Sequence, residues 1–193
     1  MMYSHTQSKT HWSNRFMIWL ESLEFDVESG KQALHLLISE FKNLRSSILK
    51  VTQQIRALSQ TPTYKEQVTL LKSIPGIGLL TAMTILTELE TIDRFSNLDK
   101  MCGYIGLVPS TKSSGEKEKN GDLTSRGHGV LRSAIIESSW TAIRNDPSLM
   151  KSYLTYLQRM DSNKAIIKIA KKLLSRIRFV LTNKVAYQRF IEQ

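Results

Sequence analysis

The residues of this chain best suited to chemistry lie in a polar, glycine-rich, basic segment from Gly106 to Arg132, which reads GLVPSTKSSGEKEKNGDLTSRGHGVLR. Two adjacent serines stand near its centre, Ser113 and Ser114, and Gly115 follows them. A serine hydroxyl can attack a DNA phosphodiester and keep the bond energy in a phosphoserine link, provided that the hydroxyl is deprotonated and the phosphate charge is neutralised. Serine in a loop is more often only a turn former, so spacing alone leaves both interpretations open.

Basic residues in the same segment are candidates for neutralising a phosphate. They are Lys112, Lys117, Lys119, Arg126 and Arg132. No general base is evident in the sequence. His128 stands between two glycines and is a candidate for that role, but we favour a place at the start of the following helix or in solvent.

A second glycine motif, Ile74-Pro75-Gly76-Ile77-Gly78, resembles the turn of a helix-hairpin-helix element. Proline would close the first helix, glycine permits positive φ and close backbone approach, and the two isoleucines would anchor the turn in the core. The unpaired amides at the start of the second helix would form an anion site. Gly76, Ile77 and Gly78 are therefore predicted to contact a DNA phosphate without reading sequence. The alternative is a plain turn between packed helices.

Carboxylates, histidines and cysteine give weaker signals for chemistry. Glu88, Glu90 and Asp93 form the only acidic cluster, but they lie at an expected helix end beside Arg94, so we expect a solvated face rather than a metal site. The four histidines are isolated, which disfavours a zinc site. Cys102 is the sole cysteine and is expected to be a small core side chain. We therefore expect no cofactor in this chain.

The charge balance points to an anionic partner. The 193 residues carry a formal net charge of +10, and 41% of them are hydrophobic, which is enough for a folded core. Basic groups near phosphates release condensed counterions on binding, so DNA or RNA is the expected partner. No apolar run approaches the roughly 20 residues that span a bilayer, and the polar N-terminus lacks a signal-peptide core. We expect no membrane attachment and a cytoplasmic, nucleoid-associated protein.

Helical periodicity predicts an all-α protein with an arm followed by a helical domain. Residues 1–12 are expected to be disordered, residues 13–61 to form the arm, and residues 62–193 to form the domain with the helix-hairpin-helix element. Ser13 is a candidate helix cap, and Ser96 or Asn97 is another. Further helices are expected at 64–73, 79–89, 98–104, 125–144, 147–160 and 163–181. Residues 109–122 contain too few apolar positions for a helix, which predicts a polar loop or a small β-hairpin.

The arm carries apolar residues in an alternation of three and four. The series, which we call the seam, is Leu34, Leu37, Phe41, Leu44, Ile48, Val51, Ile55 and Leu58. About four such heptads predict a coiled coil, and hence a homo-oligomer through residues 34–58. Gly30 removes an apolar contact and predicts a break before the seam. Because Leu36, Ile38 and Leu49 widen the stripe, an amphipathic helix packed on its own domain remains the alternative.

The last expected helix has a basic face opposite an apolar one. Its sequence between Ile166 and Arg178 is IIKIAKKLLSRIR. Such a face can simply be solvated, but beside a phosphate-binding loop it is also a possible track for a nucleic-acid backbone.

The run from Leu71 to about Arg178 resembles the C-terminal domain of the bridge-RNA-guided insertion-sequence transposases of bacteria. Four motifs occur in the family's order, namely IPGIG, RFSN, GYIGLVPSTKSSGEKEKNG and SRGHGVLR. The arm also agrees, because that family places a coiled coil between its two domains. The resemblance implies DNA and a guide (bridge) RNA as partners. It implies that the serine immediately before glycine is the nucleophile, which here is Ser114 before Gly115.

This sequence departs from the family pattern in one respect. The family's RuvC-like domain, with its metal-binding DEDD carboxylates, should precede the coiled coil and does not occur here. Mg²⁺ is expected only together with that domain. We therefore expect a DNA-binding C-terminal fragment that contributes Ser114 to a composite site for strand exchange and is inactive alone. The alternative is a non-catalytic helix-hairpin-helix protein that dimerises through its arm and inhibits transposition. A scaffold for RNA is a third interpretation.

Overall fold

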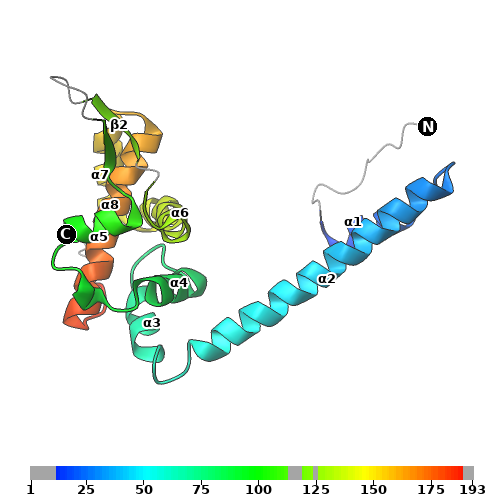
Figure 1. The fold of residues 1–193 in the computed structure, drawn as a ribbon, viewed down its shortest axis with the longest axis horizontal. Coiled ribbons are helices and arrows are strands. Elements are labelled where there is room, and N and C mark those ends of the chain that lie inside the picture. Colours follow the sequence, from blue (N-terminus) through cyan, green and yellow to red (C-terminus); the bar gives the residue numbers. More distant parts are fainter. Residues whose placement is uncertain (1–11, 113–118, 124–125, 189–193) are drawn as a thin grey trace. The chain divides into compact units, whose positions relative to one another are not determined.

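The computed structural model describes residues 12–112, 119–123 and 126–188 (Figure 1). The chain divides into two compact units, Met1–Gln54 and Ile55–Gln193. The boundary lies near the end of the long arm helix, whereas the sequence predicted it at residues 61 and 62. Of residues 1–12, which were expected to be disordered, residues 1–11 lie outside the described residues, and Trp12 is described.

The first unit is built from two helices, α1 (Asn14–Glu21) and α2 (Glu28–Leu58). Ser13 caps α1 as predicted, since its hydroxyl accepts a hydrogen bond from the Phe16 amide at 3.2 Å. Trp12 stacks on Phe41 of α2 with ring centroids 5.0 Å apart, and Lys42 of α2 forms an ion pair with the last residue of α1, Glu21. These contacts hold α1 against the first half of α2.

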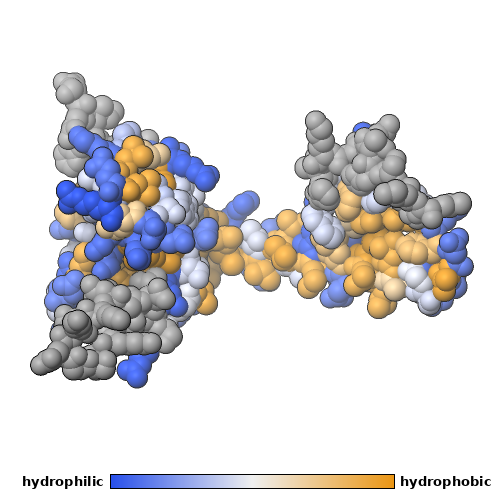
Figure 2. Space-filling view, turned by 90° about the horizontal axis from the view of Figure 1, so that it is seen from above, coloured by the Kyte–Doolittle hydropathy of each residue, from blue (hydrophilic) through white to orange (hydrophobic). Residues whose placement is uncertain are grey.

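The break predicted before the seam is present, but it lies at residues 22–27, between α1 and α2, and α2 runs without interruption through Gly30. A Cβ at Gly30 would lie 3.0 Å from the Phe25 ring, which shows that the glycine gives the preceding turn room to fold back. Much of the predicted seam is exposed within this unit: Leu37 is 68% exposed, Leu44 55% and Ile48 66%. Figure 2 shows apolar residues along this part of the chain.

The second unit is a helical domain assembled around α8 (Ser162–Asn183). Its other helices are α3 (Lys65–Lys72), α4 (Leu79–Leu89), the 3₁₀ helix η1 (Ile92–Arg94), α5 (Leu98–Ile105), α6 (Gly129–Asn145) and α7 (Pro147–Leu157). The α8 side chains Ile169, Leu173 and Ile177 are completely buried, and α8 packs against α3, α5, α6, α7 and η1. The predicted all-α fold is confirmed.

Two short strands, β1 (Pro109–Lys112) and β2 (Lys119–Leu123), form the one sheet in the described part of the chain. They pair antiparallel, with Pro109 opposite Leu123 and Lys112 opposite Lys119. This pair occupies the stretch for which the sequence predicted a polar loop or small β-hairpin.

Local capping explains where most helices begin. Asn97 caps α5, since its side-chain oxygen accepts from the Lys100 amide at 2.9 Å, and Pro147 opens α7 directly after the cap Asp146. The helix predicted over residues 125–144 begins only at Gly129. The preceding Gly127 has φ of 124°, a conformation that cannot continue a helix.

A buried ionic network fastens the junction of α6 and α7 to α8. Asp146 is 3% exposed and accepts hydrogen bonds from Arg176 at 2.7 Å, Leu149 N at 3.1 Å and the Tyr187 hydroxyl at 3.1 Å. Burial by itself would raise the pKa of the Asp146 carboxyl. The hydrogen bonds from Ser148, Leu149 and Arg176, with the Arg176 charge, outweigh burial and lower that pKa from 3.8 to about 2.

Cys102 is buried in the core, as predicted. Burial raises the pKa of its thiol, which keeps it protonated and unreactive. Over the residues that the structure describes, none of the helices combines the length and the apolar character needed to cross a bilayer.

Candidate nucleic-acid site

The segment that carries the serine pair lies between α5 and α6. Its two ends are in tight backbone contact, and we call this contact the neck. The neck consists of Gly106 and Gly127. Gly106 ends α5 in the left-handed conformation, with φ of 83°, and Gly127 has φ of 124°. A Cβ on Gly127 would lie 2.7 Å from the Gly106 Cα, so each position requires glycine both for its conformation and for space.

Hydrogen bonds close the neck on both sides. The His128 amide donates to the Tyr104 carbonyl at 3.0 Å, and Arg132 Nη1 lies 3.5 Å from the Gly106 carbonyl oxygen. Beyond the neck, β1 and β2 pair as far as Lys112 and Lys119. The two chain segments that lead to the serines are thus held together along their whole described length.

The predicted catalytic residues lie just beyond this pairing. Ser113, Ser114, Gly115 and Lys117 lie outside the described residues. The backbones of Lys112 and Lys119 are directly opposed. Two of the predicted phosphate-binding residues are thus the last described residue before segment 113–118 and the first described residue after it.

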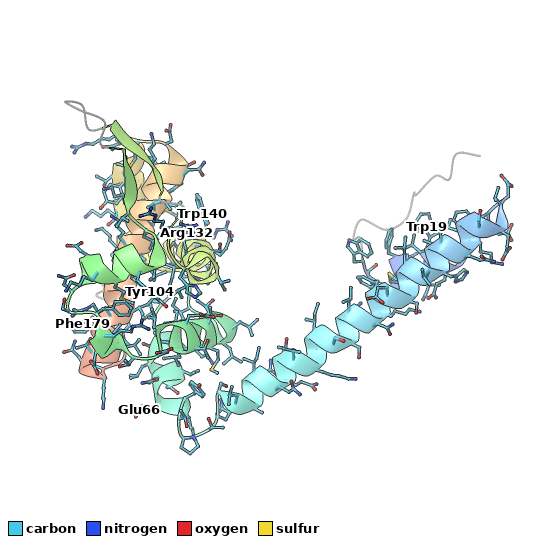
Figure 3. All side chains as sticks on the ribbon, in the orientation of Figure 1. Trp19, Glu66, Tyr104, Arg132, Trp140 and Phe179 are labelled. Atoms are coloured by element: carbon cyan, nitrogen blue, oxygen red, sulfur yellow. The ribbon has the colours of Figure 1, made fainter. Side chains whose placement is uncertain are left out.

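The two predicted arginines lie nearer the domain. Arg126 is exposed, and its carbonyl oxygen would be 2.7 Å from a Cβ on Gly106. Arg132 is half-buried, and its guanidinium reaches back to the neck from the first turn of α6 (Figure 3). One described role of Arg132 is therefore to brace the neck.

His128 has both ring nitrogens occupied. Its Nδ1 accepts from the Leu131 amide at 3.3 Å and so caps α6, while its Nε2 lies 2.7 Å from the Glu88 Oε2 of α4. An imidazole that accepts at Nδ1 carries its proton on Nε2, which donates to the carboxylate. The helix-start role expected for His128 is confirmed. Its engagement on both sides disfavours a role as general base.

Glu88 is not part of a solvated acidic face, and that prediction is wrong for this residue. Its carboxylate is 37% exposed and pairs with His128, and its carbonyl accepts from the Tyr104 hydroxyl at 3.2 Å. The guanidinium of Arg94 lies 5.1 Å from the Tyr104 ring centroid and makes a cation–π contact with the tyrosine. The end of α4, α5 and the start of α6 are thereby tied together beneath the neck.

The hairpin turn contacts the other end of α6. Ile74 is 1% exposed and Ile77 5%, so the isoleucines anchor the turn as predicted. Gly76 has φ of 92° and abuts the α6 backbone, where an added Cβ would contact the Ser138 carbonyl and lie 2.8 Å from Ala142 N. Gly76 is thus required for close packing on α6, the role that a plain turn between packed helices would give it.

Gly78 differs from Gly76. It occupies the N-cap of α4 without a side-chain cap, it is exposed, and an added Cβ would meet no atom within 4 Å. The first amides of α4 therefore lie beside open space, which is compatible with the approach of an anion.

The structure does not bring the hairpin turn and the neck into one pocket. Both rest on α6, the neck at Arg132 and the turn at Ser138 and Ala142. With a rise of 1.5 Å per residue, the six to ten residues of α6 between these contacts correspond to about 9–15 Å. The arrangement provides two separate points of contact rather than one enclosed cavity.

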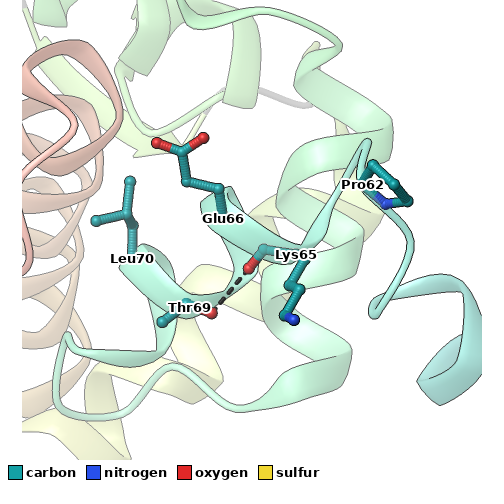
Figure 4. Close-up of a pocket in the computed structure, with 5 residues that line it drawn as sticks. All are labelled: Pro62, Lys65, Glu66, Thr69 and Leu70. Carbon is teal, nitrogen blue, oxygen red and sulfur yellow. Dashed lines mark hydrogen bonds between the residues drawn. The ribbon is translucent and has the colours of Figure 1, made fainter.

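Two further features bear on what the domain can bind. A shallow pocket on α3 is lined by Pro62, Lys65, Glu66, Thr69 and Leu70 (Figure 4). It contains none of the predicted site residues. Within the described ranges, no three His, Cys, Asp or Glu side chains are placed to share a metal ion.

The sequence did not indicate the contacts of Glu88 and Tyr104 or the contact between the two glycines of the neck. The contact between Glu88 and His128 joins helices distant in sequence, so no local pattern announces it. The glycines offered a usable signal, since Gly106 follows an expected helix at the position where a left-handed cap is common.

Comparison with known proteins identifies relatives of this chain. The model of the family "Transposase IS116/IS110/IS902" matches residues 68–154, a range that includes the hairpin turn, the neck and α6. The chain is 30% identical over 173 residues to the putative transposase y4qE of Sinorhizobium fredii, which covers 88% of this chain and 39% of the relative.

Two further relatives are also proteins of insertion elements. The chain is 28% identical to the transposase for insertion sequence element IS1111A of Coxiella burnetii, over 82% of this chain and 44% of the relative. It is 28% identical to a 43.6 kDa protein of insertion element IS110 from Streptomyces coelicolor, over 76% of this chain and 37% of the relative. The chain spans about two fifths of the length of these curated relatives. Residues 68–154 therefore match the IS116/IS110/IS902 transposase family, and the chain is related to the transposases of insertion elements.

Proposed function

We propose that this chain binds DNA and supplies Ser114 as the nucleophile of a composite site for DNA strand exchange. The observation that carries the proposal is the neck. Gly106 and Gly127 adopt conformations that other residues rarely adopt. Beyond them, the pairing of β1 with β2 brings together the two strands that flank the serine-bearing segment. A plain surface turn has no need for such restraint, whereas a nucleophile must be presented to its target in a fixed position.

The chemistry would be a transesterification at phosphorus. The Ser114 oxygen forms a bond to phosphorus, the bond from phosphorus to a deoxyribose oxygen breaks, and the leaving oxygen takes a proton. Lys112 and Lys119, at the two ends of the segment, are suited to neutralise charge on the phosphate.

Activation of the serine would come from outside this segment. An ordinary serine hydroxyl is a weak nucleophile, and His128 already uses both ring nitrogens. The described residues offer no group that fits Mg²⁺, so we propose no metal step within them. The RuvC-like domain implied by the resemblance is the proposed source of activation and of Mg²⁺.

DNA would be held mainly through its phosphates. The net charge of +10 supplies the attraction, and the open N-terminus of α4 at Gly78 is the proposed contact of the hairpin. A guide RNA is proposed as a further partner on the strength of the family resemblance.

The arm is proposed to pair with the arm of a second copy of the chain. Leu37, Leu44, Ile48 and Val51 recur at heptad spacing on α2, and each is more than half exposed. Pairing of two seams would bury these side chains, which favours a parallel or antiparallel coiled coil over a lone solvated helix.

The same exposed seam supports the alternative function. A chain with a seam but no complete active site could pair with the arm of a longer family member and inhibit it by mixed assembly. Co-expression distinguishes the two: strand exchange restored by an added RuvC-like domain supports the nucleophile, and inhibition of an intact transposase without such restoration supports the inhibitor.

The direct test of the proposed function is complementation. We expect the chain alone to bind duplex DNA without cutting it, and to exchange strands when a RuvC-like domain of the family, Mg²⁺ and the cognate RNA are added. Ser114→Ala should abolish exchange and keep binding, and Ser113→Ala, its matched control, should affect exchange much less. Cleavage by the chain alone without metal would contradict the composite site.

A further inference from the structure

We propose that the outer face of α8 is a second nucleic-acid surface, which binds a single strand of DNA and stacks one base on Phe179. The face, called the α8 face below, consists of Lys164, Lys168, Lys171, Lys172, Arg178 and Phe179. It lies apart from the hairpin turn and the neck in sequence and adds a function to the proposed one. The choice of DNA rests on the proposed function, since strand exchange displaces single strands.

The burial pattern of α8 defines this face. The residues at one helical face, among them Ile169, Leu173 and Ile177, are completely buried against the surrounding helices. Lys168 and Phe179 lie on the opposite side, and Phe179 is 58% exposed. From Lys164 to Arg178 the face extends about 21 Å along the helix at 1.5 Å per residue.

The charge on α8 is of one sign. Its 22 residues contain six basic residues and neither Asp nor Glu. Arg176 is turned toward the buried Asp146, and Lys164 lies 3.7 Å from Asp161 in an exposed pair. Lys168, Lys171, Lys172 and Arg178 therefore dominate the field of this face, which is complementary to a polyanion.

Side-chain contacts locate the two edges of the face. Lys172 Nζ lies 3.1 Å from Ser152 Oγ and 6.0 Å from the Tyr156 ring centroid, so α7 forms one edge. Arg178 donates to the Ser96 carbonyl at 3.3 Å, so the start of α5 forms the other. Helix α5 carries one carboxylate in its first turn, Asp99.

Phe179 favours a single strand over a duplex. An exposed phenylalanine has no evident structural use on a helix whose other side already fills the core, and Figure 3 labels it on α8. In a duplex the flat faces of the bases are hidden in the stack, whereas a single strand offers them. An aromatic ring beside lysines is the usual platform for single strands, because any base can stack on it while the cations follow the backbone.

The test measures binding of dye-labelled oligonucleotides by fluorescence anisotropy, with a 20-nucleotide single strand of DNA, the same single strand as RNA, and a 20-base-pair DNA duplex. Phe179→Ala should weaken single-strand binding at least fivefold and leave duplex binding within twofold, because one base stack is lost. Phe179→Trp should retain single-strand affinity. Leu154→Ala is the matched control, since Leu154 is 55% exposed on α7, and it should change neither affinity.

A charge variant tests the cationic part of the face. Lys168→Gln should reduce the slope of log K against log salt for the single strand by about 0.7, the value for one lost phosphate contact. Lys65→Gln, an exposed lysine on α3, should leave the slope unchanged. Circular dichroism confirms that each variant is folded.

Several results would overturn the proposal. Unchanged single-strand affinity in Phe179→Ala rejects the stacking role, and an equal loss on duplex reassigns the face to double-stranded DNA. A tenfold preference for a single strand of RNA rejects the commitment to DNA. A parent chain that binds duplex but not single strands rejects only this inference. A parent chain that binds neither rejects the proposed function as well.

Discussion

Glu88 and His128 meet at 2.7 Å between Oε2 and Nε2, and this contact joins the end of α4 to the start of α6 directly beneath the neck. The same histidine caps α6 through its other ring nitrogen. The His128 side chain thus caps α6, the helix that follows the serine-bearing segment, and also links the start of α6 to α4.

We expect His128→Ala to lower the free energy of unfolding by about 1–2 kcal/mol, because it removes a helix cap and a hydrogen bond to a partly exposed carboxylate. His128→Asn should lose roughly half as much, since asparagine is a good cap that cannot reach Glu88. Urea unfolding measures both values. Equal stability of the parent and the alanine variant would show that neither contact contributes.

The two glycines of the hairpin should respond differently to substitution. Gly76→Ala should disrupt the fold, because its Cβ would collide with α6 and its φ of 92° disfavours any side chain. Gly78→Val should fold normally, because the space around Gly78 is open. Thermal unfolding of the two variants tests this difference.

Gly78→Val also tests the proposed phosphate contact. A valine at the N-cap of α4 would crowd the first amides, so duplex affinity should fall to a similar extent for unrelated DNA sequences. Gly129→Ala, another open glycine at the start of a helix, is the control. Unaltered affinity in a correctly folded Gly78→Val protein would make the turn purely structural.

The Asp146 network predicts an acid-sensitive contribution to stability. The folded-state pKa of about 2 lies below the ordinary value of 3.8, so the ionised carboxylate stabilises the fold fully above pH 3.8. This contribution, about 2 kcal/mol from 1.36 kcal/mol per pKa unit, is lost as pH falls from 3.8 toward 2. Urea unfolding from pH 2 to 6 should show the loss in the parent. The same series should show a smaller change in Asp146→Asn.

The arm should lose its self-association when charge enters the seam. Leu44→Asp with Val51→Asp places two carboxylates where side chains that are now 55% and 52% exposed would be buried in a coiled coil. Light scattering should report an oligomer for the parent and a monomer for the double variant. The control replaces Glu40 and Lys50, exposed polar residues of α2, with alanine. A monomeric parent would refute pairing through residues 34–58.

Local signals predicted much of the fold. Ser13, Asn97 and Pro147 mark helix starts that the structure bears out, because capping is decided by neighbouring residues alone. The break before the seam lies at residues 22–27 rather than at Gly30, since the surrounding helix formers of α2 outweigh the cost of one glycine. The late start of α6 was missed because Gly127 serves a contact with Gly106, which is distant in sequence.

The candidate site was less predictable than the fold. The serine, lysine and glycine pattern of segment 106–132 indicated chemistry, but spacing could not reveal that the neck is closed or that His128 is committed to Glu88 and Leu131. Both depend on the packing of α4, α5 and α6, which periodicity does not encode.

The central claim, that Ser114 becomes covalently joined to DNA, is tested most directly by mapping the adduct. The chain is incubated with a RuvC-like domain of the family, Mg²⁺, cognate DNA and RNA, and the reaction is stopped by denaturation. Nuclease and protease digestion followed by mass spectrometry then locates the nucleotide on the protein. The account predicts a nucleotide phosphoester on Ser114, absent in Ser114→Ala and present in Ser113→Ala. An adduct at any other residue, or strand exchange by Ser114→Ala, would contradict it.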